Sequence, residues 1–164
     1  MSHSAARRDL QEVTIKQAWG YLLSEDDPVI ELRALHPLSN STRLSHLRRS
    51  DYLAPEAYKA AVEQQALELN EQGFNVYTLL NPLRSDFVDK AARDQDIQCR
   101  RLLMIDIDRS KPTRQPASEN EIKLAKKLAE EVIAFLEHYE TTRVIRLMSG
   151  NGVHLYFSLD HLEN

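Results

Sequence analysis

The sequence predicts an α+β fold in which a mainly antiparallel sheet is flanked by helices. Two long segments have helical hydrophobic periodicity, several short runs read as strands, and a glycine turn joins the last two runs as in a hairpin. With 164 residues, of which 42% are hydrophobic, the chain is long enough to bury the core of one compact domain. We expect that domain over residues 13–164, after a flexible polar tail at residues 1–12.

The first elements alternate between helix and strand. A short helix is expected over 14–23, and the DDP sequence then interrupts the chain before a strand over 29–35. Within that strand Ile30 and Leu32 share one face. The long, basic, serine-rich connection over 36–54 has no assigned structure, although part of it could pair as a strand, and connections of this length are often functional.

The middle of the chain predicts a second helix and a second strand. Pro55 suits the first position of a helix that runs to about Glu71, and Gly73 favours its end. The apolar run over 74–80 predicts a strand, because it is short and rich in β-branched and aromatic residues. The Asn-Pro pair at 81–82 is a turn signal that stops this strand.

The second half of the chain contains the strongest strand signal. A short helix is expected over 86–96, and the apolar run at 100–108 then predicts a buried strand. Ser118 and Glu121 form a capping-box pattern that begins a long helix, which we expect to reach about Tyr139.

A hairpin is expected at the end of the sequence. The run over 141–148 predicts a strand, and SGNG at 149–152 predicts a tight turn. The run over 153–159 predicts the antiparallel partner.

Composition and charge narrow the classes of protein. The single cysteine, Cys99, excludes an internal disulfide, and the N-terminal sequence lacks the apolar stretch of a signal peptide or membrane anchor, so we expect a cytoplasmic protein with no membrane partner. The net charge of −4 argues against a protein that coats polyanions generally. The positive charge is nevertheless concentrated in the 36–54 connection and around residues 100–114, at Arg43, Arg48, Arg49, Arg100, Arg101, Arg109, Lys111 and Arg114.

Two acids end the 100–108 strand. Side chains alternate along a strand, so Asp106 and Asp108 project to the same side. Two carboxylates so close repel each other and need a cation, an arginine or open water. A hard divalent ion such as Mg²⁺ fits, because it binds one or two carboxylates and completes its shell with water and phosphate. The alternative is a strand end that reaches solvent, with both acids paired to nearby arginines.

The hairpin offers complementary groups. Gly150 and Gly152 allow a tight turn and a close approach to the main chain, where free N–H groups can hold phosphate oxygens. His154 lies just beyond the turn, on one strand face with Tyr156, and can donate to a triphosphate. The alternative is an ordinary hairpin with a half-exposed histidine. The conjunction of the two motifs favours a site where metal and phosphate meet.

The ordered motifs resemble those of the archaeo-eukaryotic primase (primase-polymerase) superfamily, in the form found in plasmid, phage and other mobile-element replication proteins. In that superfamily a hydrophobic strand ends in DxD and a small-residue turn is followed by histidine, as in RRLLMIDID (100–108) and SGNGVHLYF (149–157). ELRAL (31–35) and NVYTLLNP (75–82) precede them in the family's order, so the resemblance covers about residues 29–160. It implies an RRM-like catalytic core and template-directed nucleotidyl transfer.

The resemblance also implies residue roles. Asp106 and Asp108 would hold one or two Mg²⁺ or Mn²⁺ ions, one for the attacking 3′-hydroxyl and one for the triphosphate and leaving pyrophosphate. His154 would steady the triphosphate. The turn residues that would shape the phosphate pocket are Ser149, Gly150 and Gly152. The implied partners are nucleoside triphosphates, a single-stranded DNA template, and a helicase or other replication protein.

Further nucleotide contacts are implied less directly. Arg33 matches the arginine of the family's first strand, although Glu31 on the same face could simply pair with it. Asn81 matches the turn after the second strand and would contact the nucleotide or merely cap that turn. Lys111 stands where many relatives have arginine in the loop after the acids.

The chain departs from the family pattern at its end. The superfamily has a third motif, an acid on a later strand, and Asp160 is too near the hairpin to replace it, so we expect an N-terminal part of a longer catalytic domain or a relative with an incomplete metal site. Two other functions stay open. A catalytically inactive primase-like module would bind nucleic acid through Arg43, Arg48 and Arg49. A haloacid-dehalogenase-like phosphatase would use Asp106 as its nucleophile.

Overall fold

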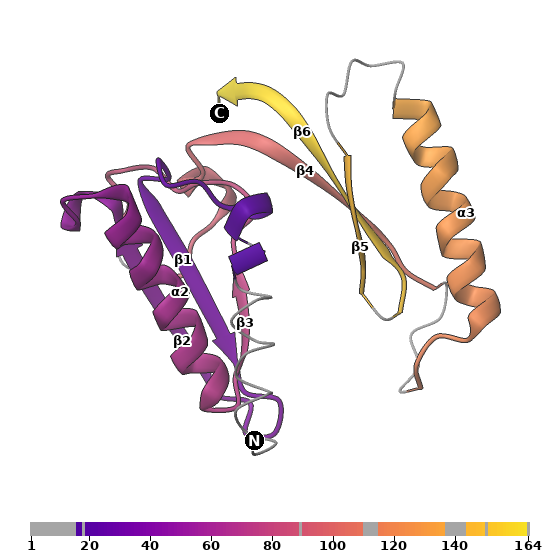
Figure 1. The fold of residues 1–164 in the computed structure, drawn as a ribbon, viewed down its shortest axis with the longest axis horizontal. Coiled ribbons are helices and arrows are strands. Elements are labelled where there is room, and N and C mark those ends of the chain that lie inside the picture. Colours follow the sequence, from indigo (N-terminus) through magenta and orange to yellow (C-terminus); the bar gives the residue numbers. More distant parts are fainter. Residues whose placement is uncertain are drawn as a thin grey trace. The chain divides into compact units, whose positions relative to one another are not determined.

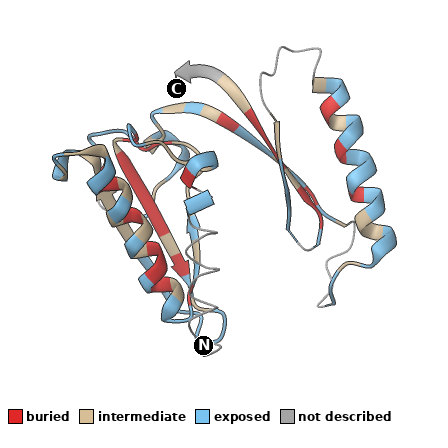
Figure 2. Ribbon diagram, viewed as in Figure 1, coloured by how far each residue is buried: buried red, intermediate tan, exposed pale blue. Residues whose placement is uncertain are grey.

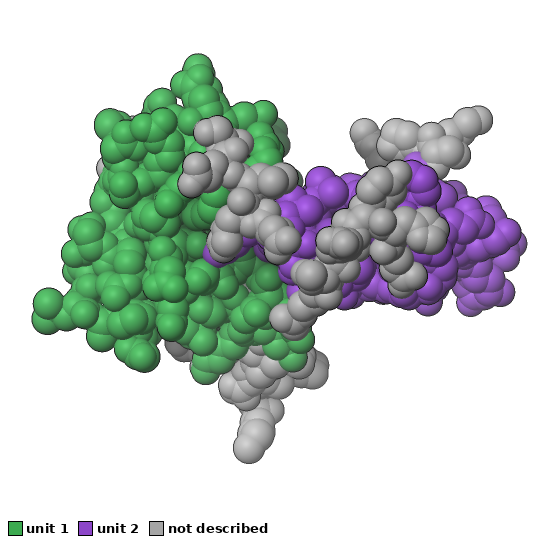
Figure 3. Space-filling model, turned by 90° about the horizontal axis from the view of Figure 1, so that it is seen from above, with its two compact units in different colours: residues 1–100, 163–164 green, residues 101–162 purple. Residues whose placement is uncertain are grey.

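The computed structural model of the chain has an α+β fold with two three-stranded antiparallel sheets (Figure 1). It describes residues 16–17, 19–88, 90–109, 115–136, 144–149 and 151–163. The chain divides into two compact units, residues 1–100 with 163–164 and residues 101–162, which Figure 3 colours separately. The α+β class is as predicted, but the strands form two sheets where the sequence predicted one. The expected tail at 1–12 lies outside the described residues.

The first unit contains the sheet β2-β1-β3. Its central strand β1 (Val29–Leu35) pairs antiparallel with β2 (Thr42–Arg48) and with β3 (Asn75–Thr78). The helix α2 (Pro55–Glu71) begins with proline, as predicted, and Gly73 follows it with a positive φ of 88°. A side chain at that φ would be strained, so glycine suits the end of this helix.

One face of this sheet packs on α2, and β1 is buried along most of its length (Figure 2). Tyr58 is completely buried there, and its hydroxyl donates to the Asp27 and Leu47 carbonyls. The buried residues of this core are Trp19, Ile30, Leu32, Tyr58, Val62 and Ala66. Trp19 belongs to the first helix, which the structure describes at residues 16–17 and 19–22, within the predicted 14–23.

The opposite face is partly covered by the segment over 83–97. Leu83 and Phe87 are buried against Val29, and Leu83 forms isolated bridges with Val29 and Ile97. The helix predicted over 86–96 is wrong: the described residues there contain only a 3₁₀ turn, η2 (Asp94–Asp96). Leu83 and Ile97 bridge each other at the two ends of this segment, and Phe87 is buried in one cluster with Val29, so contacts with distant residues take the place of a helical repeat.

The 36–54 connection is more ordered than the sequence suggested. Residues 42–48 form β2, as the sequence allowed for part of this connection, and a 3₁₀ turn, η1 (Arg49–Asp51), follows directly. The strand that the sequence allowed within this connection is therefore present, and it carries Arg43 and Arg48. TRLSHLR lacks clean alternation, so its strand character depends on pairing with β1.

The second unit contains the sheet β4-β6-β5 with α3 on one face. The strands are β4 (Cys99–Ile107), β5 (Val144–Met148) and β6 (Val153–Glu163), and the helix is α3 (Glu119–Leu136). The predicted hairpin and the strand over 100–108 are confirmed, apart from Asp108, which follows the strand. The core side chains are Ile107, Ala125, Ala129, Ile133, Val153, Leu155 and Phe157.

The predicted start of α3 is confirmed as well. The Ser118 hydroxyl accepts from the Glu121 N–H at 3.4 Å, and the Glu121 carboxylate accepts from the Ser118 N–H at 2.8 Å. These reciprocal bonds form the capping box. The predicted extension to Tyr139 lies outside the described residues. Among the described helices, none is long and apolar enough to cross a membrane.

Candidate functional site

The DxD strand and the histidine of the hairpin lie side by side in the second unit. β6 lies between β4 and β5, so the two motifs are on neighbouring strands. His154 Nε2 lies 3.3 Å from Asp106 Oδ1, on the face opposite α3. Both side chains reach solvent, with 28% of His154 and 44% of Asp106 exposed. A carboxylate and an imidazole are thus presented together to a ligand.

The glycine turn packs directly on the end of β4. A Cβ built on Gly152 would lie 2.0 Å from the Ile107 carbonyl oxygen and 2.9 Å from Asp108 Oδ1. No side chain fits at that distance from a backbone oxygen. Gly152 has no positive φ, so glycine is needed here for close approach and not for an unusual backbone conformation. Asp108 is therefore held beside this turn, as Asp106 is held beside His154.

The turn is closed by its own hydrogen bonds. The Ser149 N–H donates to the Gly152 carbonyl at 3.1 Å, and the Gly152 N–H donates to Ser149 Oγ at 3.0 Å. The Gly152 amide is thus occupied within the turn, and a phosphate would have to replace the serine hydroxyl to use it. Gly150, the other predicted phosphate-binding glycine, lies outside the described residues.

Arg109 connects the acid-bearing loop to the same turn. Its guanidinium lies 3.4 Å from Asn151 Oδ1 and also donates to the Gln115 carbonyl. These contacts join the residue that follows Asp108 to the turn between β5 and β6. Lys111, expected in this loop as a nucleotide contact, lies outside the described residues.

Tyr156 is a site residue to which the sequence reasoning gave no role. Its hydroxyl lies 3.4 Å from His154 Nδ1. Burial, and then the charge of Asp106, raise the pKa of Tyr156, so its hydroxyl stays protonated and can donate to Nδ1. That arrangement leaves the Nε2–H of His154 directed at Asp106. The signal was present in the sequence, because Tyr156 follows His154 by two residues and shares its strand face.

The donor chemistry of the two acids fits a hard divalent cation. Asp106 and Asp108 are both exposed and offer carboxylate oxygens, and Mg²⁺ requires one or two of these beside water and phosphate. Among the described residues, no group of three or more His, Cys, Asp or Glu side chains is placed to hold a metal. A metal at this site would therefore depend on ligands besides these side chains, such as substrate phosphates.

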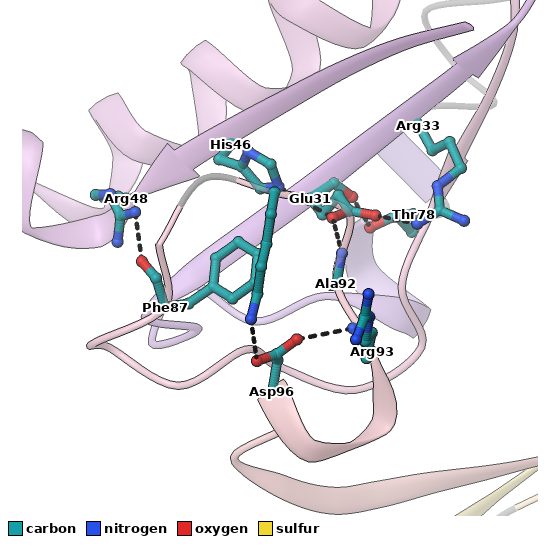
Figure 4. Close-up of polar contacts among 10 residues, drawn as sticks. Glu31, Arg33, His46, Arg48, Thr78, Phe87, Ala92, Arg93 and Asp96 are labelled. Carbon is teal, nitrogen blue, oxygen red and sulfur yellow. Dashed lines mark hydrogen bonds and ion pairs between the residues drawn. The ribbon is translucent and has the colours of Figure 1, made fainter.

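The acid of the first sheet is bound very differently (Figure 4). Glu31 is 1% exposed, and its carboxylate accepts from Arg33 at 2.8 Å, His46 at 3.0 Å and the Ala92 N–H at 3.0 Å. Burial alone would raise the pKa of Glu31, but these hydrogen bonds outweigh it and hold the pKa below its usual value. Arg33 therefore pairs with Glu31, as the sequence allowed, while 39% of its side chain stays exposed.

The remaining predicted contacts also belong to the first unit. Asn81 is half-buried in the turn after β3. Arg43 stacks on the Phe74 ring at 4.5 Å, while Arg48 donates to the Phe87 carbonyl at 2.6 Å and Arg49 to the Tyr52 carbonyl at 2.8 Å. Because Arg43 and Arg48 lie five residues apart in one strand, they face opposite sides of the sheet. These arginines therefore do not form one continuous basic surface, although they are close together in the sequence.

The chain matches none of the protein-family models, curated proteins or solved structures with which it was compared. The resemblance to the primase superfamily therefore depends on the order and chemistry of the sequence motifs alone.

Proposed function

We propose that the chain carries out template-directed nucleotidyl transfer in DNA replication, as the primase or DNA polymerase of a plasmid, phage or other mobile element. The observation that carries this proposal is the contact of 3.3 Å between His154 Nε2 and Asp106 Oδ1. It joins the metal-binding motif and the phosphate-binding motif that the resemblance implies. Nucleoside triphosphates and a single-stranded DNA template are the substrates.

Asp106 and Asp108 are the side chains that would hold Mg²⁺ or Mn²⁺. When bound, the metal supplies charge stabilisation for the triphosphate and for the attacking 3′-hydroxyl. Asp106 lies next to the imidazole and Asp108 next to Gly152, so a triphosphate that approaches the acids comes within reach of His154. The Nε2–H of His154 can donate to a phosphate oxygen there.

Tyr156 and Ser149 have supporting roles in this proposal. Tyr156 can donate to Nδ1, and in that arrangement the Nε2 proton of His154 lies on the side of the acids. Ser149 holds the turn closed through the Gly152 N–H. Both groups fix the geometry of the site before substrate arrives.

The phosphatase alternative is less well supported. Its nucleophilic aspartate belongs to a parallel sheet, whereas β4, which carries Asp106, lies in an antiparallel sheet. The inactive nucleic-acid-binding module stays a second candidate, because the described residues provide two metal-binding carboxylates and no third.

The test is synthesis on a primed and an unprimed single-stranded template with Mg²⁺ or Mn²⁺ and nucleotides. Asp106→Asn and Asp108→Asn should each abolish synthesis, and His154→Ala should raise the nucleotide KM. Glu131→Gln is the matched control, because Glu131 is an exposed acid of the same unit that pairs with Lys127 on α3. It should leave the rate unchanged.

Two results would separate the alternatives. Synthesis that survives in either aspartate variant would overturn the metal assignment. If the parent chain makes no product yet the Asp106→Asn/Asp108→Asn double variant still binds DNA, the chain is the non-catalytic module. Metal-dependent binding of a labelled nucleotide, measured in parallel, shows whether a site without turnover still holds its ligand.

A further inference from the structure

The sheet β2-β1-β3 packs on α2 with one face. On its other face, exposed side chains lie together at one end. Arg33 in β1 lies directly across from Leu44 in β2 and from Tyr77 in β3. Residues directly opposite in antiparallel strands point to the same face. The next row is formed in the same way by Thr42, Leu35 and Asn75. We call these two rows the open sheet surface.

Within the part of the chain that the structure describes, the segment that covers the other end of this face stops before these two rows. Residues over 83–97 pack on Val29, and Ala92 bonds Glu31, at the other end of the same face. Beyond Glu31 the side chains reach solvent: Tyr77 is 51% exposed, Leu44 is 40% exposed and the Arg33 side chain is 39% exposed. An aromatic ring, an aliphatic side chain and a guanidinium thus lie in one row across three strands.

Arg33 is held in place within this row. Its Nη2 donates to Glu31 Oε1 at 2.8 Å, while more than a third of the side chain stays exposed. Glu31 is in turn fixed by His46 and by the Ala92 N–H. The guanidinium therefore loses little side-chain freedom when it binds a ligand, which favours affinity.

The positive charge of Arg33 on the open sheet surface favours an anionic partner. Among the residues of β1, β2 and β3 on this face, Glu31 is the only acid, and it is 1% exposed and already neutralised by its donors. The exposed charge of the two open rows is the cationic Arg33. An acidic ligand with flat apolar groups matches this combination of arginine, tyrosine and leucine.

We propose that the open sheet surface binds single-stranded nucleic acid, with an unpaired base stacked on Tyr77 and packed against Leu44, and Arg33 next to the phosphate backbone. Aromatic side chains with nearby arginines on a sheet are suited to unpaired bases, which expose a flat face that duplex DNA hides. The choice of nucleic acid over another anion rests on the proposed function. The surface itself would bind single-stranded nucleic acid in the absence of metal and of any reaction.

The test is binding of a fluorescently labelled oligothymidylate to the whole chain, measured by anisotropy in EDTA. Tyr77→Ala should weaken binding roughly tenfold, the size of one lost base–aromatic stack, and Tyr77→Phe should keep most of it. Tyr21→Ala is the matched control, because Tyr21 is 45% exposed on the first helix and lies outside the sheet. Its affinity should equal that of the parent.

An abasic oligonucleotide of equal length separates base stacking from phosphate attraction. The parent should bind it more weakly than oligothymidylate, and Tyr77→Ala should bind both alike. Leu44→Glu and Leu44→Lys form a second pair of variants at an exposed position in an edge strand. The glutamate should weaken binding of the oligonucleotide, and the lysine should strengthen it. Circular dichroism checks that each variant is folded.

Several outcomes would overturn the inference. Parent-like affinity in Tyr77→Ala, equal binding of abasic and normal strands, or equal effects of both charges at Leu44 would each exclude base stacking on this surface. Binding of an acidic peptide in preference to oligothymidylate would assign the surface to a protein partner. Binding is measured in EDTA, without metal or nucleotide, so a failed synthesis assay and a failed binding assay remain distinguishable.

Discussion

Each of the two sheets carries an acid in a strand, and the two acids are held in opposite ways. Glu31 in β1 is 1% exposed and accepts three hydrogen bonds, whereas the Asp106 side chain in β4 is 44% exposed and has one histidine at 3.3 Å. A buried carboxylate must be paired for the chain to fold, while an exposed one keeps oxygens for a ligand. Glu31 therefore organises the first unit, and Asp106 is available for chemistry.

Among the substitutions in the two units, Gly152→Ala should lower the free energy of unfolding most, because it disrupts the contact that holds the turn against β4. The new methyl group would lie 2.0 Å from the Ile107 carbonyl, so β6 and β4 must separate locally. We expect a loss of about 3 kcal/mol in the free energy of unfolding, at the upper end of overpacking effects. Urea denaturation followed by circular dichroism measures it.

Gly20→Ala is the control for that substitution. A Cβ on Gly20 meets nothing within 4 Å, and Gly20 is helical. Alanine there should leave stability unchanged or raise it slightly, by up to about 1 kcal/mol. Equal destabilisation by both variants would mean that the close approach at Gly152 is not the cause.

Glu31→Gln should have the next largest effect, on the first unit. The amide keeps the shape of the side chain but cannot accept from Arg33, His46 and the Ala92 N–H as a carboxylate does. Roughly 2 kcal/mol of stability should be lost, the scale of hydrogen bonds to a charged group. Asp86→Asn, which removes an exposed acid bonded to Arg84, should leave the midpoint of unfolding unchanged.

The same carboxylate should make the first unit sensitive to acid. The pKa of Glu31 is lower in the folded chain than the unfolded value of 4.5, because the hydrogen bonds outweigh burial. Its contribution to stability is thus fully present above pH 4.5 and is lost as the pH falls through the lowered folded pKa. The difference in unfolding free energy between parent and Glu31→Gln should shrink over that range. A difference independent of pH would contradict the assignment.

Asp106→Asn should have the smallest effect on stability. Because the side chain is 44% exposed and its contact is with one half-exposed histidine, the free energy of unfolding should change by no more than about 0.5 kcal/mol. Thermal unfolding measures this, and the synthesis assay measures function on the same sample. A loss as large as that of Glu31→Gln would remove the distinction between the structural and the available acid.

The elements with strong local signals were predicted well. The capping box of α3, the proline start of α2 and the hairpin are each set by a few neighbouring residues. The predictions that were wrong or left without an assignment depended on distant partners. β2 is a strand because it pairs with β1, and the described residues over 83–97 lack the predicted helix, with Leu83 and Phe87 packed on Val29.

The sequence by itself determined which residues could form the candidate site: alternation places Asp106 on one strand face, and the glycine turn places His154 at the start of the next strand. Only the tertiary structure decided their neighbours. The position of β6 next to β4 brings His154 to Asp106 and leaves no room for a side chain at Gly152, and the cover over 83–97 makes Glu31 a buried group. The physical reason is that periodicity and turn preference are local, whereas burial and strand pairing join residues far apart in the chain.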